Sequence, residues 1–284
     1  MTRFGALVRI VRPVNCVMMG FAVIVGAALV GGDVFAEKVL VPLIFGFLTG
    51  FFLTGSSMVV NDVIDREIDA VNEPGRPIPS GVVSLRQAQV FAVVLSVLGF
   101  SLALATNWEC LLIAIVAWFA FTMYSLWGKR AGFLGNLLVS FCVVIPFVYG
   151  GFVAKTEFAE TSLIFVALAF LSNTGREVTK GIVDVEGDSG KSVQTVAVRF
   201  GTRIAAVVAV IFYASAAVLS VIPSELRLVS FWFVPFVLVC DGGLIASSAL
   251  ILRDFSRENA RRIKRLVLVW FVFGLVAFLA GTIG

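Results

Sequence analysis

Residues 40–69 read LVPLIFGFLTGFFLTGSSMVVNDVIDREID, a long apolar run that ends in a cluster of acidic and amide side chains. A helix rises about 1.5 Å per residue, so about 20 apolar residues cross the roughly 30 Å hydrocarbon core of a membrane. The acidic side chains would then lie where the membrane meets the aqueous phase. This stretch predicts a transmembrane helix that brings polar chemistry to one membrane surface.

The rest of the chain has the same apolar character. Of its 284 residues, 60% are hydrophobic and 14% are charged, and the mean hydropathy is +1.03. A soluble domain carries roughly 25% charged residues, which excludes a soluble globular protein. We expect an all-α polytopic protein of the cell membrane, a single domain over 1–284 with nine transmembrane helices in one bundle. The predicted spans are 13–31, 40–60, 86–106, 109–127, 132–153, 160–178, 202–222, 229–251 and 263–282.

The positions of the basic residues predict the orientation of these spans. If the N-terminus is cytoplasmic, nine spans place every Lys and Arg on the cytoplasmic side except Lys38, Lys155 and Arg227. Cytoplasmic loops are enriched in Lys and Arg, and a miscounted span would destroy this asymmetry. We therefore expect a cytoplasmic N-terminus, an external C-terminus and two long cytoplasmic loops near 61–85 and 175–203.

The composition also restricts the chemistry. The chain has no histidine, which excludes histidine-based zinc sites, Ser-His-Asp triads and haem ligation through histidine. The cysteines lie in or beside apolar runs without CxxC spacing, and we interpret them as reduced packing residues. They are Cys16, Cys110, Cys142 and Cys240.

Four oxygen-bearing side chains follow the second predicted span. On a continuous helix, Asn61, Asp62, Asp65 and Asp69 fall within an arc of about 100°. Like charges this close repel each other, and a cation between them relieves the repulsion. Oxygen ligands of this kind suit Mg²⁺, which commonly binds one or two carboxylates together with substrate phosphate oxygens.

The sixth predicted span ends in a matching segment. On a continuous helix, five of its polar side chains would share an arc of about 80°, although three glycines make that continuation uncertain. Both acidic segments end on the same side of the membrane, so we expect them to face each other across one cavity near the cytoplasmic face. The five side chains are Asn173, Glu177, Lys180, Asp184 and Asp188.

Cationic side chains surround the two acidic segments. Arg76 lies in the proline-rich loop after the first, Arg176 and Lys180 flank the second, and Lys129 closes the fourth span. Arginine forks and lysine charges both bind phosphate. The combination indicates a Mg²⁺-bound diphosphate whose apolar tail lies among the helices, which would keep water from a reactive allylic cation.

At these residues the sequence resembles the UbiA family of membrane prenyltransferases. The NDxxDxxxD motif of the family corresponds to Asn61-Asp62-xx-Asp65-xxx-Asp69, and its DxxxD motif corresponds to Asp184-xxx-Asp188. The resemblance extends over essentially the whole chain. The segments NEPGRPIPSG and REVTKGIVDVEGDSGKSVQTVAVRFG most resemble the archaeal branch, whose members transfer a geranylgeranyl group to geranylgeranylglyceryl phosphate.

The resemblance implies a role for each candidate residue. Two Mg²⁺ ions would bridge the donor diphosphate to four ligands, with assistance from Asp62 and Asp69, while Tyr124 would steady the allylic cation or contact the diphosphate. The implied metal ligands are Asn61, Asp65, Asp184 and Asp188. The implied diphosphate-binding residues are Arg76, Lys129, Asn173, Arg176 and Lys180.

The implied substrates are geranylgeranyl diphosphate and the hydroxyl of geranylgeranylglyceryl phosphate, which give digeranylgeranylglyceryl phosphate for ether lipids. Two alternatives stay open from the residues themselves: an aromatic acceptor, as in quinone or haem side-chain synthesis, and a membrane transporter, since intramembrane carboxylates often mark ion pathways. Asp241, near the middle of the eighth predicted span, is an ionisable group without an assigned role. Nothing in the sequence supports nucleic-acid binding.

Overall fold

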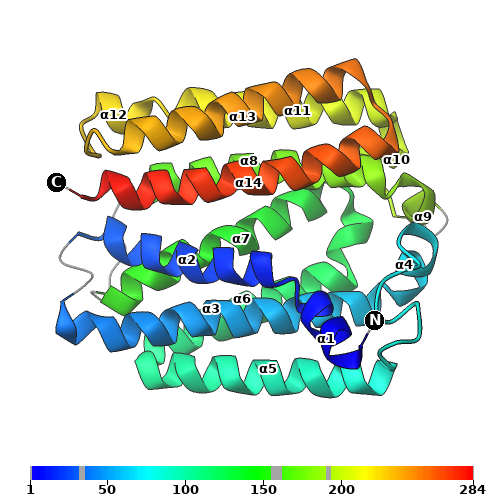
Figure 1. Ribbon diagram of the computed structural model, residues 1–284, viewed down its shortest axis with the longest axis horizontal. Coiled ribbons are helices and arrows are strands. Elements are labelled where there is room, and N and C mark those ends of the chain that lie inside the picture. Colours follow the sequence, from blue (N-terminus) through cyan, green and yellow to red (C-terminus); the bar gives the residue numbers. More distant parts are fainter. Residues whose placement is uncertain (1, 32–35, 155–161, 190–192, 284) are drawn as a thin grey trace. The chain divides into compact units, whose positions relative to one another are not determined.

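The computed structural model describes residues 2–31, 36–154, 162–189 and 193–283, and every regular element within these ranges is a helix (Figure 1). The chain divides into two compact units. Unit 1 comprises Met1–Trp127 with Ile145–Phe158, and unit 2 comprises Gly128–Val144 with Ala159–Gly284. The prediction of a single domain concerns how the two units act together, and it stays a prediction.

Unit 1 contains the first six helices and the end of the seventh. The short α1 and the longer α2 are bent by 46° at Arg12, which has a positive φ of 56° and precedes Pro13. A proline at the first position of a helix is favourable, so Pro13 starts a new helix and the bend lies directly before it. The helices are α1 (Arg3–Val11), α2 (Pro13–Leu29), α3 (Glu37–Ile64), α4 (Arg66–Asn72), α5 (Leu85–Thr106) and α6 (Trp108–Leu126).

Unit 2 contains the beginning of α7 and all later elements. Helix α7 carries Pro146 in its interior and passes from unit 2 to unit 1 between Val144 and Ile145. The elements are η1 (Gly128–Ala131), α7 (Phe133–Ala154), α8 (Ser162–Val183), α9 (Val185–Ser189), α10 (Val196–Phe200), α11 (Thr202–Leu219), α12 (Ile222–Glu225), α13 (Phe233–Arg253) and α14 (Arg257–Gly281).

Small residues bring the helices of unit 1 into close contact. A side chain added at Gly26 of α2 would overlap the carbonyl oxygen of Phe147 in α7, and one added at Gly150 would overlap the carbonyl oxygen of Val23. Helices in membranes associate by van der Waals packing and by polar contacts, and small residues let their backbones approach. The glycines therefore set the contact between α2 and the end of α7.

Hydroxyl groups join α3 to its neighbours in the same unit. The buried Ser56 hydroxyl hydrogen-bonds the carbonyl oxygen of Ala92 at 3.0 Å and lies 2.7 Å from the Ser96 hydroxyl, both in α5. Buried hydroxyl groups need such partners because lipid offers none. These contacts hold the helix that carries the first acidic segment.

Tyr213 links α11 to α8 in unit 2. Its ring lies against Gly175, where an added Cβ would come within 2.7 Å of the ring, and its hydroxyl lies 3.0 Å from the Thr179 hydroxyl. Tyr213 is 1% exposed and belongs to the main apolar core of the unit. This contact fixes the half of α8 that carries the second acidic segment.

Each of the nine predicted spans coincides with a helix in the described part of the chain. Among the described residues, seven helices are long and apolar enough to cross a membrane, and the bent pair of α1 and α2 makes eight. The remaining predicted span, 160–178, falls on α8, whose described residues do not reach the same apolarity because its second half is polar. Residues 160 and 161 lie outside the described residues.

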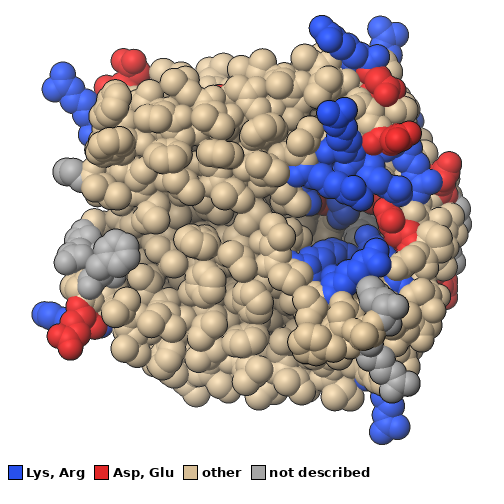
Figure 2. All heavy atoms as spheres, viewed as in Figure 1, with Lys and Arg blue, Asp and Glu red and all other residues tan. Residues whose placement is uncertain are grey.

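The surface supports a lipid environment. Figure 2 shows uncharged surface along the middle of the helices, with charged side chains at their ends. On α5, Val90, Val93, Val97 and Leu104 are each more than half exposed. Large apolar side chains exposed in such a continuous band mark contact with lipid. The protein is thus an all-helical, multi-pass membrane protein.

The close contact at Gly150 gives a test of this packing. We expect Gly150→Val to lower the unfolding free energy by about 1–3 kcal/mol, because the added side chain meets backbone that cannot move aside. The measurement is thermal unfolding of the purified protein in detergent. Gly242→Val is the matched control, since nothing lies within 4 Å of a Cβ built there. Equal unfolding temperatures for the two variants would contradict the assigned contact.

Candidate functional site

The first acidic segment lies at the junction of α3 and α4. Helix α3 ends at Ile64, Asp65 occupies the junction, and α4 begins at Arg66. The amide of Asp65 donates to the carbonyl of Asn61 at 2.8 Å, and the amide of Asp69 donates to the carbonyl of Asp65 at 2.8 Å. Helical hydrogen bonding thus continues through the junction and keeps these side chains on related faces.

Burial follows the predicted helical face. Asn61, Asp62, Asp65 and Asp69 are between 3% and 6% exposed, whereas Glu67 between them is exposed. Ionised side chains are rarely buried unless they are paired or bind a ligand. The four residues face the interior of unit 1 because they share one side of an almost continuous helix.

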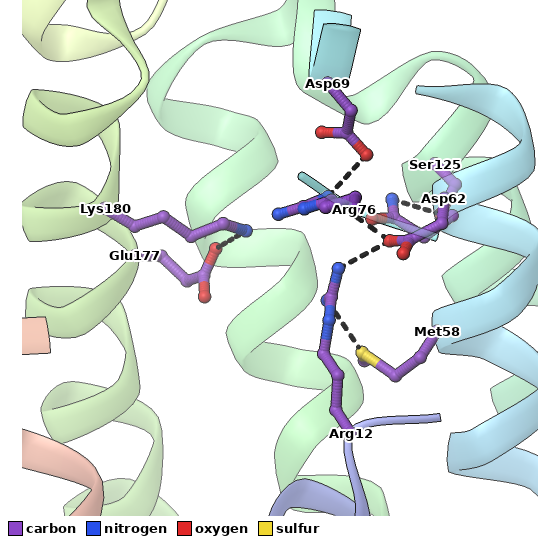
Figure 3. Close-up of polar contacts among 9 residues, drawn as sticks. Arg12, Met58, Asp62, Asp69, Arg76, Ser125, Glu177 and Lys180 are labelled. Atoms are coloured by element: carbon purple, nitrogen blue, oxygen red, sulfur yellow. Dashed lines mark hydrogen bonds and ion pairs between the residues drawn. The ribbon is translucent and has the colours of Figure 1, made fainter. Parts of the chain in front are cut away.

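Two arginines pair with the carboxylates of Asp62 and Asp69 in this segment (Figure 3). Arg12 donates to Asp62 Oδ1 at 2.5 Å. Arg76 bridges two carboxylates, with its Nη1 atom 3.3 Å from Asp62 Oδ1 and 2.5 Å from Asp69 Oδ2. Charge-assisted hydrogen bonds of this kind are about twice as strong as neutral ones. The proline-rich loop and the bend between α1 and α2 are therefore both fastened to the acidic face of α3 and α4.

Sequence reasoning did not assign Arg12 to the site, and counted it only among the residues that orient the protein. Its Nη1 also lies 3.1 Å from the Met58 sulfur, so the side chain runs along the end of α3. The available signal was the Arg12-Pro13 pair, which predicts a break between helices and hence an arginine held at a fixed bend.

Asp69 has a perturbed acidity. Burial raises the pKa of this carboxyl group to about 6, against the opposing attraction of Arg76, and the nearby Asp62 charge adds to the increase. Desolvation disfavours the ionised form of a carboxyl group. Asp69 therefore changes its charge much closer to neutral pH than an ordinary aspartate does.

Asn61 and Tyr124 lie on neighbouring helices of unit 1. The Asn61 amide nitrogen donates to the Ser125 hydroxyl at 3.3 Å, so a metal would meet the amide oxygen of this residue. Tyr124 is 5% exposed, and its ring centroid is 5.9 Å from that of Phe121. The contact to Ser125 ties the end of α3 to the end of α6.

The second acidic segment repeats this local structure in unit 2. Helix α8 ends at Val183, Asp184 occupies a junction, and α9 begins at Val185. The amide of Asp184 donates to the carbonyl of Lys180 at 3.2 Å, and that of Asp188 donates to the carbonyl of Asp184 at 3.0 Å. Asp184 is half-buried and Asp188 is buried. The first aspartate of each motif thus lies where a long helix passes into a short one.

The Glu177 carboxylate pairs with two cations of the second segment. This carboxylate accepts from Lys180 at 3.2 Å, as Figure 3 shows. It also accepts from Arg176 at 3.2 Å, and Glu177 is 7% exposed. Sequence reasoning noted Glu177 on this face but gave it no role. Its spacing of three residues from Lys180 on a helix was the signal for the pairing.

Asn173 lies further along α8, where its amide nitrogen donates to the Ser140 hydroxyl of α7 at 3.1 Å. The side chain of Lys129 lies outside the described part of the structure. The acidic residues are divided between the two units, and among the described residues no three acidic side chains form a cluster that could hold a metal ion. The donors present are carboxylate and amide oxygens, which fit Mg²⁺ chemically.

Comparison with known proteins identifies the family. The profile of the UbiA prenyltransferase family matches residues 19–273. The chain belongs to this family. It is 34% identical to a digeranylgeranylglyceryl phosphate synthase of Methanopyrus kandleri, over 97% of this chain and 98% of the relative. It is 35% identical to a digeranylgeranylglyceryl phosphate synthase of Archaeoglobus fulgidus, over 93% of this chain and 90% of that protein.

Solved structures of UbiA family proteins have the same fold. A structure described as digeranylgeranylglyceryl phosphate synthase in membranes is 27% identical, covers 99% of both chains and has a TM-score of 0.71. A UbiA homologue from Aeropyrum pernix is 19% identical over 95% of this chain and 98% of its own, with a TM-score of 0.81. A homologue from Archaeoglobus fulgidus bound to DMAPP and Mg²⁺ is 18% identical over 96% of this chain and 98% of its own, with a TM-score of 0.64.

The acidity of Asp69 predicts a change of stability with pH. The pKa of Asp69 is about 6 in the folded protein against an ordinary value of 3.8, so the unfolded chain releases this proton first as the pH rises. Stability from this residue is therefore complete below about pH 4 and is lost by about pH 6. We expect Asp69→Asn to remove this part of the pH dependence in thermal unfolding measured from pH 4 to pH 7. An unchanged profile in the variant would contradict the raised pKa.

Proposed function

We propose that the protein transfers a geranylgeranyl group from geranylgeranyl diphosphate to the hydroxyl of geranylgeranylglyceryl phosphate, forming digeranylgeranylglyceryl phosphate for archaeal ether lipids. The observation that carries this assignment is the near-full-length similarity to digeranylgeranylglyceryl phosphate synthases. The two acidic junctions support it, because they supply the carboxylates and cations that a diphosphate substrate requires. In the reaction the allylic carbon–oxygen bond breaks, an ether bond forms, and diphosphate and the hydroxyl proton leave.

The proposal includes a membrane topology. Nine transmembrane helices, with α8 as the sixth, would place the N-terminus in the cytoplasm and the C-terminus outside, as the distribution of Lys and Arg predicts. The polar second half of α8 is compatible with a membrane helix that lines a substrate cavity, where ionisable groups are tolerated. In this topology both acidic junctions lie on the cytoplasmic side, where one cavity would take the diphosphate while the prenyl tail extends among the helices.

Four oxygen donors would hold the magnesium ions. They are the amide oxygen of Asn61 and the carboxylates of Asp65, Asp184 and Asp188. When bound, Mg²⁺ supplies positive charge that stabilises the departing diphosphate. Asp62 and Asp69 would support the ligands from the same helical face, because Arg12 and Arg76 already pair with these two carboxylates.

The remaining polar residues would bind the diphosphate directly. We assign this role to Arg76, Lys129, Asn173, Arg176 and Lys180. Guanidinium groups bind phosphate oxygens through paired hydrogen bonds, and lysine adds a point charge. The ring of Tyr124 would steady the positive charge that develops on the allylic carbon, while the apolar helices exclude water from it.

The acidic junctions give a direct test of this assignment. We expect Asp65→Ala and Asp184→Ala each to lower kcat by about a hundredfold or more, because charge on the departing diphosphate loses its stabilisation. Product formation would be followed by mass spectrometry at saturating substrates. Glu67→Ala is the control, since this acidic residue lies two positions after Asp65 but is exposed. Normal turnover in both aspartate variants, with their folding intact, would overturn the site.

The identity of the acceptor requires a competition experiment. Purified protein would receive Mg²⁺, geranylgeranyl diphosphate, geranylgeranylglyceryl phosphate and 4-hydroxybenzoate together, with EDTA added to a parallel sample. We expect a double-tailed glyceryl phosphate that forms only without EDTA. Prenylation of 4-hydroxybenzoate alone would overturn the acceptor and favour the aromatic alternative.

A further inference from the structure

The beginning of α14 carries a groove whose residues have no role in the site described above. The groove is lined by four arginines and one glutamate, followed by two apolar residues nearer the middle of the helix. Figure 2 shows basic side chains over this end of α14 and uncharged surface further along it. The lining residues are Arg257, Glu258, Arg261, Arg262, Arg265, Leu266 and Val269.

The groove lies on the face of α14 that does not pack into unit 2. Ala260, Ile263 and Val267 are completely buried in the core of that unit. Arg262 and Arg265 are exposed, and at 100° per residue they fall on the opposite side of the helix from these three residues. The arginines are therefore positioned toward the surroundings of the protein by the same periodicity that anchors the helix.

The residue type indicates what the groove binds. Membrane topology requires positive charge on the cytoplasmic side, but arginine and lysine meet that requirement equally. The basic residues that line the groove are all arginines, whereas Lys264 of the same helical turn is not part of the lining. Arginine differs from lysine in its planar fork, which forms paired hydrogen bonds with a phosphate group.

The electrostatics of the helix also favour a bound anion. Arg257, Arg261 and Arg265 are spaced four residues apart, a spacing at which like charges repel each other along a helix. Arg257 also lies in the first turn of the helix, where the partial positive charge of the backbone disfavours a cation. Glu258, together with Glu186 through its ion pair with Arg257, offsets only part of this charge. An anion in the groove would relieve both unfavourable effects.

The apolar end of the groove is suited to a hydrocarbon tail, so the groove as a whole fits a phosphate-bearing lipid better than free phosphate. Leu266 is half-buried, and Val269 is 48% exposed, one helical turn beyond Arg265. The groove thus changes from charged to apolar along the axis of a helix that crosses the membrane. A headgroup at the arginines would leave its hydrocarbon tail along these two side chains.

Arg257 connects the groove to the second acidic junction within unit 2. Its Nε donates to the carbonyl of Val183 at 3.0 Å, and its Nη1 donates to the Glu186 carboxylate at 2.9 Å. Val183 is the last residue of α8, directly before Asp184. The arginine groove therefore begins beside the segment that we assign to magnesium.

We propose that this groove binds the phosphate monoester headgroup of a glyceryl phosphate lipid. A phosphate monoester carries a charge between −1.5 and −2 near neutral pH, roughly, so it matches a cluster of arginines better than a phosphodiester does. Only the identification of this lipid with the acceptor or the product rests on the proposed function. The headgroup chemistry rests on the arginines themselves.

The test compares lipid binding between two double variants of the full chain. Arg262→Gln with Arg265→Gln removes two exposed arginines of the groove. Arg203→Gln with Arg253→Gln removes two exposed arginines of the same unit outside it. Binding of dioctanoyl phosphatidic acid in detergent would be measured by native mass spectrometry. We expect an affinity loss of about tenfold or more in the groove variant and a near-native affinity in the control.

Three further probes identify the source of the phosphate chemistry. Dioctanoyl phosphatidylglycerol, dioctanoyl phosphatidylcholine and inorganic phosphate would be tested on the unaltered protein, and each should bind more weakly than phosphatidic acid. Equal binding of phosphatidylglycerol would overturn the monoester assignment, and equal binding of inorganic phosphate would overturn the assignment to a lipid. Unchanged phosphatidic acid binding in the groove variant would overturn the site.

The same variants separate this inference from the proposed function. A raised KM for geranylgeranylglyceryl phosphate with kcat unchanged would identify the acceptor as the bound lipid. In a second outcome, the groove variant loses phosphatidic acid binding while the unaltered protein prenylates only 4-hydroxybenzoate. That pair of results would support the lipid site and would overturn the proposed acceptor.

Discussion

The Asp62 carboxylate accepts hydrogen bonds from the guanidinium groups of Arg12 and Arg76, while only 3% of its residue surface is exposed. A buried ionised carboxylate without partners is strongly unfavourable, and removal of one partner from a buried pair costs several kcal/mol. The acidic end of α3 can therefore stay buried only if the bend between α1 and α2 and the loop carrying Arg76 fold against it. This single requirement orders three separate segments of unit 1.

Unit 2 also compensates a buried carboxylate with cationic side chains, but in a different way. There the buried Glu177 carboxylate lies between Arg176 and Lys180 on one helix, so the compensation is local. In both units an aspartate occupies the point where a long helix passes into a short one, with helical hydrogen bonds on either side. Such a junction keeps a carboxylate at a fixed direction from the end of a rigid helix, which is what a metal ligand needs.

The sequence predicted the helices well because lipid leaves the backbone few choices. An apolar segment in a membrane must satisfy its own amides and carbonyls, so length and composition identify a helix directly. The shared burial of Asn61, Asp62, Asp65 and Asp69 followed from helical periodicity in the same way. These are local properties, and local patterns determine them.

The features that sequence reasoning missed depend on contacts between distant residues. Arg12 and Asp62 are 50 residues apart, and no periodicity relates a bend before one helix to the end of another. The polar residues in the second half of α8 can be recognised in the sequence. Whether this helix crosses the membrane depends on the surfaces that surround it, and its own composition does not determine that.

The passage of α7 from one unit to the other has a consequence for how the protein is made. The partner of Gly26 in α2 is Phe147, which the ribosome adds only after α3, α5 and α6 have been synthesised. The glycine face of α2 must therefore wait in the membrane, covered by lipid or by the insertion machinery, until α7 arrives. Unit 1 is completed by a segment that follows the first residues of unit 2, so the order of assembly differs from the order of translation.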